Sequence, residues 1–545
     1  MTPRRWCGAA LVASVTYFVV AASLWLNRPG LYMDELPFVQ AALPHHYPNQ
    51  VFVTRSIYGL PVLVMPYYGT LKAAIFLPIF ALWGVSVGTI RLPAIGISAM
   101  TIVLAYLMAR EIVGRWGLVL VVVMATCPTF IFMSKVDLGP IAVAMFLTMT
   151  VLLAFFRYLH GGGIRWLAAF LAACLLGIFD KQNFSWLLIG VAVAAAIVYH
   201  RPLWRTIRRR LVATLVTFGA LIAVAVPLVW SIVLPNLSAG GSSSLQDPLT
   251  HLASTSALFA RTIGYSEMVN FFTGRVAGQP GWMDWMTIAA VVALMLLGIR
   301  RLVGPLPEAA AVPAQAACFF AILFAVMFVE VAATKQAMWA WHVIELLPYP
   351  VLVGLCSTLA VVRSGITLKK SIVAVATIGL LGTLVVQGVA TAQFVSVMRN
   401  PSQVRAVFST DVYRDAAFLN ANSAGVNEIV TSGWGPGTPI FALACPDERL
   451  KYFDDLWPHV LVGVTAKSAP GVVQELFGNE RILLVSVSDP ARVGIPTSLT
   501  ANVALLEQGY AEAFPGRHAQ RVLSTDAYNI TYFGPGTFHP AHRSC

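Results

Sequence analysis

Charged residues are scarce in this sequence. Asp, Glu, Lys and Arg make up 11% of its 545 residues, and hydrophobic residues make up 58%, whereas an average water-soluble protein carries about 25% charged residues. This scarcity excludes a water-soluble globular protein. The formal net charge is +12, but in a membrane protein Lys and Arg collect in cytoplasmic loops. The basic excess therefore reports topology, and we expect no nucleic-acid partner.

Cysteine motifs and internal repeats are also missing. None of the seven cysteines belongs to a Cys-x-x-Cys pair, which argues against zinc clusters and thioredoxin-like redox sites. No repeat recurs at the periods typical of solenoids. Cys445 and Cys545 fall in the C-terminal region, where an oxidising compartment would allow them to pair. Sequence spacing leaves a disulfide and two unpaired thiols equally open.

Long apolar runs, in contrast, are abundant. A helix needs about 20 apolar residues to cross about 30 Å of hydrocarbon. The first run is longer than the 7–15-residue core of a secretory signal, so we expect it to remain as the first helix. The fold class predicted is an α-helical polytopic membrane protein of about eleven spans, at 7–26, 92–109, 116–133, 138–156, 166–180, 184–199, 211–234, 285–300, 315–333, 343–362 and 371–391.

The basic residues predict the orientation of these spans. If the N-terminus is cytoplasmic, nearly every basic cluster falls on the cytoplasmic side, as the positive-inside rule requires. The clusters are Arg4/Arg5, Arg110/Arg115, Arg157/Arg165, Arg201/Arg205/Arg208/Arg209/Arg210, Arg300/Arg301 and Arg363/Lys369/Lys370. We therefore expect a multi-pass plasma-membrane protein with a cytoplasmic N-terminus and an extracytoplasmic C-terminal region.

Two segments interrupt this pattern. Residues 27–91 form a large extracytoplasmic loop within a transmembrane domain of residues 1–394, and its semi-apolar stretches Ile57–Met65 and Ile75–Trp83 fit two interfacial helices. The alternative is a twelfth span at 73–83, which would reverse all later helices and place the Arg201 cluster outside. Residues 395–545 are richer in charge, Asn and Gly, and predict a small extracytoplasmic α/β domain with β-like runs at 428–431, 481–487 and 521–532.

Titratable residues gather at the outer ends of the predicted spans. They are Asp34, Glu35, Lys135, Asp137, Asp180, Lys181, Lys335, His342 and Glu345. A transporter places such groups near the bilayer midplane, so this distribution favours an outward-facing catalytic site. Each residue also has a simpler explanation, such as a solvated loop for Asp34-Glu35, a snorkelling Lys135, an interfacial ring for His342, or a neutralised turn at Asp180-Lys181.

These residue types suit one reaction in particular. Paired carboxylates accept a proton from a hydroxyl or bind a divalent cation, and lysines bind an anionic phosphate. Sugar transfer from a lipid-phosphate donor needs a carboxylate base and cations that stabilise the departing phosphate. Lys181 and Lys335 are the candidates for the second task.

Several segments, in their order along the chain, resemble the GT-C class of membrane glycosyltransferases. The branch is the one that contains protein O-mannosyltransferases and the aminoarabinose transferases of lipid A, and the resemblance covers roughly residues 1–395. The segments are Tyr32–Glu35, Phe80–Pro93, Ala109–Arg115, Ser134–Asp137, Gly177–Gln182 and Lys335–Pro348.

The resemblance implies an inverting hexosyl- or pentosyltransferase that uses a polyprenyl-phosphate sugar, with a glycan, lipid or protein hydroxyl of the cell envelope as acceptor. It implies catalytic roles for Asp34, Glu35 and Asp137, and donor-phosphate binding by Lys181, Lys335 and His342. A divalent metal ion remains open, with Asp34 and Asp137 as its ligands if it is present. No β-trefoil module follows the spans, which favours a bacterial inner-membrane enzyme in contact with membrane lipids. The alternatives are a lipid or glycan transporter and an inactive envelope scaffold.

Overall fold

The computed structural model describes residues 3–43, 53–65, 67–228, 248–274, 307–334, 339–364, 369–400, 403–431, 437–443, 450–452, 465–478, 480–488 and 498–541. The predicted span at 285–300, the predicted phosphate ligand Lys335, and both Cys445 and Cys545 lie outside these residues.

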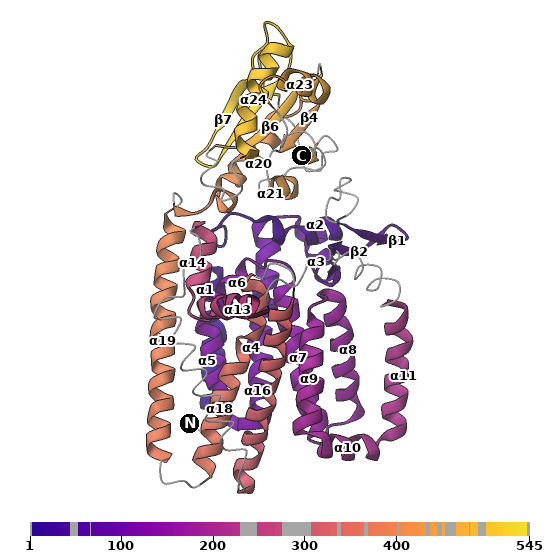
Figure 1. Cartoon of the computed structure of the whole chain (residues 1–545), viewed down its shortest axis with the longest axis vertical. Coiled ribbons are helices and arrows are strands. Elements are labelled where there is room, and N and C mark those ends of the chain that lie inside the picture. The colour runs from indigo at the N-terminus through magenta and orange to yellow at the C-terminus, as the bar shows by residue number, and fades with distance from the viewer. Residues whose placement is uncertain are drawn as a thin grey trace.

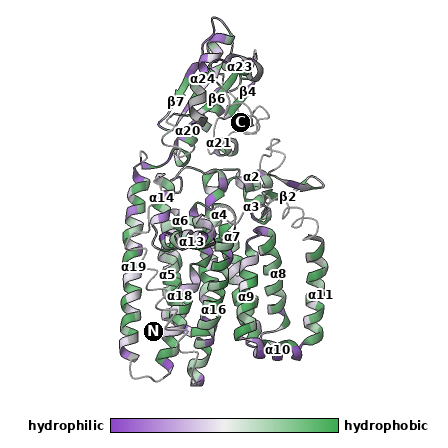
Figure 2. Ribbon diagram, viewed as in Figure 1, coloured by the Kyte–Doolittle hydropathy of each residue, from purple (hydrophilic) through white to green (hydrophobic). Residues whose placement is uncertain are grey.

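A bundle of roughly parallel and antiparallel helices forms the body of the protein (Figure 1). The long helices are α1 (Pro3–Ser23), α4 (Val87–Val113), α7 (Ile141–Leu159), α8 (Ile164–Asp180), α9 (Phe184–Val198), α11 (Leu211–Leu228), α16 (Glu308–Ala333), α18 (Pro348–Arg363) and α19 (Lys369–Arg399). Figure 2 shows apolar residues along most of their length and hydrophilic residues on α10 (His200–Arg209). The chain is thus a multi-pass helical membrane protein, as predicted.

Short helices complete the bundle. They are η2 (Gly114–Gly117), α5 (Leu118–Thr126), α6 (Pro128–Lys135), α13 (Pro248–Ile263), α14 (Ser266–Thr273), α17 (Ala340–Val343) and η4 (Ile344–Leu346). The predicted span 116–133 is therefore two short helices, because Pro128 has no backbone N–H and begins a new helix after Cys127. Among the described residues six helices are long and apolar enough to span a bilayer, or seven with the bent pair α9 and α10. The figure of about eleven spans stays a prediction.

The segment 27–91 is only partly helical. It contains η1 (Met33–Glu35), α2 (Pro37–Ala42), the strands β1 (Arg55–Ile57), β2 (Leu60–Met65) and β3 (Tyr68–Gly69), and α3 (Leu71–Trp83). The predicted helix at 57–65 is wrong: Ile57 pairs with Leu60 across Tyr58 (φ 51°) and Gly59 (φ 78°), and two positive φ values favour a tight hairpin. The helix predicted at 75–83 is confirmed within α3.

The length of α3 argues against a twelfth span. Its 13 residues extend about 20 Å at 1.5 Å per residue, less than the roughly 30 Å of hydrocarbon. The start of α1 and helix α10 lie at one end of the bundle, and segment 27–91 and the C-terminal region lie at the other (Figure 1). This arrangement places the Arg201 cluster away from Asp34.

The loop is fixed to the end of α8 by its third strand. Tyr68 forms a β-bridge with Lys181, and the Gln182 N–H donates to the Tyr67 carbonyl (3.0 Å). Gly69 lies directly against the Phe179 carbonyl, so a Cβ at this position would collide with backbone. The contact therefore requires glycine.

We expect Gly69→Ala to displace β3 from α8 and to destabilise the protein by about 1–3 kcal/mol, the usual cost of overpacking. The measurement is thermal unfolding of the detergent-purified protein, together with limited proteolysis of the loop. Gly379→Ala on α19 is the matched control, because no atom lies within 4 Å of its added Cβ and alanine favours a helix. Equal stability of the two variants would contradict the docking of β3.

The C-terminal region is an α/β unit built on a five-stranded sheet of order β5-β4-β6-β8-β7. Pairs β4/β5 and β4/β6 are parallel, and pairs β6/β8 and β7/β8 are antiparallel. The elements are η6 (Ala406–Phe408), α20 (Asp411–Asn422), β4 (Glu428–Thr431), α21 (Gly437–Leu443), β5 (Leu450–Tyr452), α23 (Ala469–Phe477), β6 (Ile482–Val487), α24 (Ser498–Ala513), β7 (Gln520–Ser524) and β8 (Tyr528–Phe533). The predicted runs 428–431 and 481–487 correspond to β4 and β6, and the run 521–532 is two antiparallel strands, β7 and β8, joined by a turn at residues 525–527. The boundary at 395 stays a prediction of domain organisation, and α19 continues past it to Arg399.

Candidate active site

A buried ion pair shapes the turn that carries Asp34. The Glu35 carboxylate accepts hydrogen bonds from Arg91 Nη2 (2.7 Å) and Nε (2.8 Å) and from the Tyr32 N–H (2.9 Å). Arg91 is fully buried near the start of α4, and it also donates to the carbonyls of Leu26, Pro29 and Gly30. Arg91 thus ties the whole segment 26–35 to α4, with Glu35 as its counter-ion.

Asp34 differs from its neighbour. Its side chain is half-buried, and among the described residues its carboxylate has no hydrogen-bond or ion-pair partner. Burial, reinforced by the negative charge of Glu35 and opposed by Lys72, raises the pKa of Asp34 to about 7. Burial and the nearby Asp34 also raise the pKa of the Tyr67 phenol. Asp34 is therefore a reachable carboxyl group that changes protonation near neutral pH.

Asp137 is held by a lysine that the sequence did not single out. Lys72 Nζ lies 2.8 Å from Asp137 Oδ2, and both side chains are buried. Lys72 also donates to the Gly139 carbonyl (2.9 Å), and Asp137 Oδ1 accepts from the Ala142 N–H in the first turn of α7 (2.9 Å). Asp137 therefore joins α3 to the start of α7.

Lys181 forms the third buried ion pair. Its Nζ lies 2.8 Å from Glu345 Oε1 and donates to the Trp341 carbonyl (3.5 Å). Asp180 beside it, the last residue of α8, is fully buried, and neither of its carboxylate oxygens has a hydrogen-bond partner in the part of the chain described.

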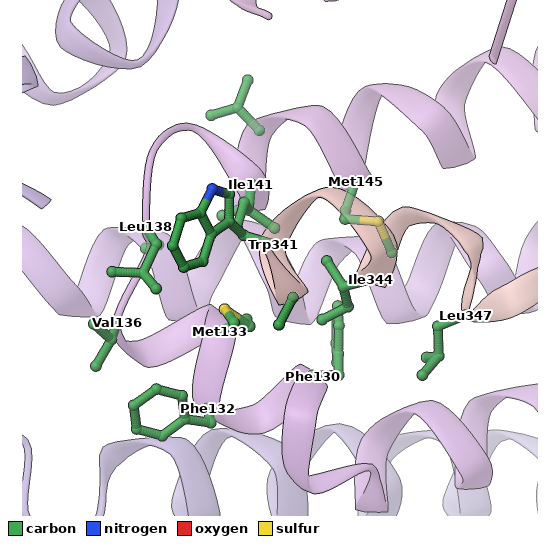
Figure 3. Packing of buried hydrophobic residues seen from close by; sticks show 14 of the residues in the cluster. Phe130, Phe132, Met133, Val136, Leu138, Ile141, Met145, Trp341, Ile344 and Leu347 are labelled. Carbon is green, nitrogen blue, oxygen red and sulfur yellow. The ribbon is translucent and has the colours of Figure 1, made fainter. Parts of the chain in front are cut away.

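The segment that carries Glu345 is fixed by apolar packing. Figure 3 shows Trp341, Ile344 and Leu347 against residues of the α6–α7 region; those labelled there are Phe130, Phe132, Met133, Val136, Leu138, Ile141 and Met145. Trp339 stacks on Trp341 with ring centroids 5.3 Å apart. His342 Nδ1 accepts a hydrogen bond from the Trp339 N–H (3.3 Å), so this nitrogen closes the turn of α17.

The structure gathers most of the predicted site residues at one end of the bundle. Tyr68 lies between these groups: it forms a β-bridge with Lys181, and burial together with the charges of Asp34 and Glu345 raises the pKa of its phenol. Neither Lys72 nor the structural role of Arg91 was predicted from the sequence. A signal for both was present in the sequence. Each is a single basic residue within an apolar run, and a charge buried in such a run needs a counter-ion.

The described residues do not assemble a divalent-metal site. Asp137, one of the two predicted ligands, is paired with Lys72 at 2.8 Å. No group of three or more His, Cys, Asp or Glu side chains gathers at ligand distance within the described ranges.

Comparisons with solved structures identify the fold. ArnT from Cupriavidus metallidurans in the apo state matches over 98% of this chain and 98% of its own, with 12% identity and a TM-score of 0.57. The Archaeoglobus fulgidus oligosaccharyltransferase in the apo form matches with 12% identity and a TM-score of 0.51, over 89% of this chain and 70% of that chain. The archaeal oligosaccharyltransferase AglB from Archaeoglobus fulgidus, in complex with an inhibitory peptide and a dolichol-phosphate, matches with 13% identity and a TM-score of 0.51, over 89% and 69%.

These proteins are GT-C glycosyltransferases, and the match extends over almost the whole chain. At this level of identity the likeness establishes the fold. The chain has the GT-C fold, as its sequence motifs predicted. No protein-family model and no curated protein sequence matches it.

Proposed function

We propose that this protein transfers a sugar from a polyprenyl-phosphate donor to a hydroxyl group of an extracytoplasmic acceptor, with inversion at the anomeric carbon. The observation that carries the proposal is Asp34. It is a reachable carboxyl with a pKa of about 7, on a turn held rigid by the buried Glu35–Arg91 pair. A general base is most effective when its pKa lies near the working pH.

The proposed reaction is a single displacement. The acceptor oxygen attacks the anomeric carbon while its proton passes to Asp34, and the bond between that carbon and the phosphate oxygen breaks. The electron pair of this bond leaves with the lipid phosphate, which gains negative charge. Cations that meet this charge lower the barrier.

Lys181 is our candidate for this cation, with Lys335 and His342 as further donor-phosphate residues. The complex of AglB with dolichol-phosphate supports a lipid-phosphate donor for this fold. In the structure Lys181 is paired with Glu345 at 2.8 Å, so donor binding would exchange a carboxylate for a phosphate at the same ammonium group. Lys181 would keep a counter-ion in this exchange, but the buried Glu345 carboxylate would lose its partner, so Glu345 would have to take up a proton or share the ammonium group with the phosphate, because an unpaired buried ion is costly.

Glu35 and Asp137 take different roles from Asp34 in this proposal. Both carboxylates are buried and already paired, Glu35 with Arg91 and Asp137 with Lys72. Their carboxylate oxygens are therefore already engaged by these cations, whereas the Asp34 carboxylate has no such partner among the described residues. We therefore assign them as positioning residues that hold the segments on either side of Asp34.

The proposal includes a location. We place the protein in a bacterial inner membrane with a cytoplasmic N-terminus, and we place Asp34 and the C-terminal domain on the extracytoplasmic side. Its partners are then the polyprenyl-phosphate sugar, a glycan, lipid or protein acceptor of the envelope, and the membrane lipids. The basic cluster on α10, at the bundle end opposite Asp34, supports this orientation.

The pH dependence of turnover follows from Asp34. A carboxyl with a pKa of about 7 is protonated and inactive as a base at pH 5, and deprotonated at pH 8. We expect kcat/KM to rise about tenfold per pH unit below pH 7 and to level off above it. Initial rates of the reconstituted protein between pH 5 and 9 measure this. A rise of kcat/KM centred near pH 4, typical of an ordinary carboxylate, would contradict the assignment of Asp34 as the base. A kcat/KM that does not change with pH would also contradict it.

The function itself is tested in cells. Mass spectrometry of envelope glycans, lipids and glycoproteins from cells with and without the protein should reveal one sugar substituent that disappears with it. Restoring the wild-type protein should restore the substituent, and restoring an inserted Asp34→Asn variant should not. An unchanged envelope under conditions where the protein is expressed would count against the proposal.

A further inference from the structure

Helix α10 has features that the proposed transfer reaction does not use. It follows α9 after a bend of 96° and lies across the end of the bundle, between α9 and α11 (Figure 1). None of its residues is buried. Its sequence contains four arginines within ten residues and no acidic residue.

The arginines share one face of α10. Arg201, Arg205, Arg208 and Arg209 follow the i, i+4, i+7, i+8 spacing of a helix face, and all four are exposed. None is paired with a carboxylate in the part of the chain that the structure describes. Four adjacent positive charges without counter-ions form a surface that fits an anionic partner.

The opposite face of α10 fixes its orientation. Leu203 and Ile207 pack against the cluster of Tyr158, Leu167 and Leu171 on α7 and α8. The next residue, Arg210, donates to the Gly162 carbonyl at 2.9 Å, which ties the end of the helix to the α7–α8 connection. The basic face is therefore held away from the bundle.

Apolar side chains on and beside α10 are exposed on the protein surface. Ile197 on α9 is 57% exposed, Val212 on α11 is 77% exposed, and Trp204 on α10 is 59% exposed. Exposed aliphatic residues on spanning helices contact lipid tails, and an exposed Trp beside them is typical of the headgroup level. The neighbour available to the basic face is thus the lipid headgroup layer.

We propose that α10 binds anionic phospholipid headgroups at the membrane surface opposite the candidate active site. The bound phosphates neutralise the four arginines, and they fix the position of α11, which packs on α8 and α10. The proposal does not depend on the transfer reaction.

Native mass spectrometry of the full-length protein in mild detergent, titrated with dioleoylphosphatidylglycerol or dioleoylphosphatidylcholine, tests this. We expect the wild-type protein to bind the anionic phosphatidylglycerol more tightly than the zwitterionic phosphatidylcholine. The triple variant Arg201→Gln/Arg205→Gln/Arg208→Gln should weaken phosphatidylglycerol binding about tenfold or more, because each arginine near the surface adds to the electrostatic attraction. Its binding of the choline lipid should change little.

The matched control removes three other exposed arginines near the same end of the bundle, Arg110→Gln/Arg115→Gln/Arg165→Gln. It changes the net charge by the same amount and should bind the lipid within about threefold of wild type. A second variant, with lysine at positions 201, 205 and 208, keeps the charge and should keep most of the binding. The proposal would be overturned if the two glutamine triple variants lost phosphatidylglycerol binding equally, or if the lysine variant lost it. It would also be overturned if the wild-type protein showed no preference for the anionic lipid.

Discussion

Asp34→Asn is expected to lower kcat by about 10²–10⁴-fold, the usual contribution of a general base, and to leave the protein folded and inserted. Asparagine keeps the size of the side chain but cannot accept the proton of the attacking hydroxyl. The Asp34 carboxylate has no hydrogen-bond or ion-pair partner among the described residues, so its neutralisation breaks no ion pair there. The measurement is single-turnover transfer by purified protein, alongside its thermal unfolding temperature.

The matched control for this variant is Asp526→Asn. It makes the same chemical change at an exposed position between β7 and β8, far along the chain from the site, and should keep wild-type turnover. Turnover by Asp34→Asn within threefold of wild type would show that Asp34 is not the base. Loss of folded protein would instead show that the turn depends on its charge.

Removal of Arg91 is expected to produce the largest loss of stability. Arg91→Leu leaves the buried carboxylate of Glu35 unpaired and frees the carbonyls of Leu26, Pro29 and Gly30. Breaking one partner of a buried ion pair costs about 3–5 kcal/mol. We expect a lower thermal unfolding temperature in detergent and a parallel loss of turnover, because the Asp34 turn is no longer held.

The pair Arg157–Glu111 is the control for this prediction. Its atoms lie 2.7 Å apart, as in the buried pair, but its side chains are 33% and 20% exposed. Arg157→Leu should therefore cost about 1 kcal/mol or less. Glu35→Gln separates positioning from catalysis: wild-type stability combined with abolished turnover would make Glu35 a catalytic residue and contradict its assignment here.

The sequence predicted the general arrangement because two signals are strong in membrane proteins. Apolar runs identify the helices, and the alternation of arginine clusters separates the two ends of the bundle. Both signals predict Asp34, Asp137 and Lys181 at the same end of the bundle, and in the structure the three residues lie at the end that carries segment 27–91. The strands of the C-terminal region were also recognisable from short β-branched runs such as Glu428–Thr431.

The pairings within the site were not predictable in this way. Glu35 and Arg91 are 56 residues apart, and Lys181 and Glu345 are 164 residues apart, and no local pattern specifies which opposite charges meet. Lys72 lies between the two stretches predicted as interfacial helices, and its counter-ion Asp137 is 65 residues further along the chain. The hairpin at Tyr58-Gly59 was missed because Tyr is an unusual residue for positive φ.

In the proposed function the protein catalyses sugar transfer and does not only bind or move a lipid-linked sugar. The most direct measurement uses purified protein in liposomes, with a radiolabelled polyprenyl-phosphate sugar and an extract of envelope acceptors. We expect the label to move from the lipid fraction to an acceptor with release of polyprenyl phosphate, and we expect the Asp34→Asn substitution to prevent this transfer. Movement of intact labelled lipid across the bilayer with no change in its sugar, equally in wild type and in Asp34→Asn, would contradict it and favour a transporter.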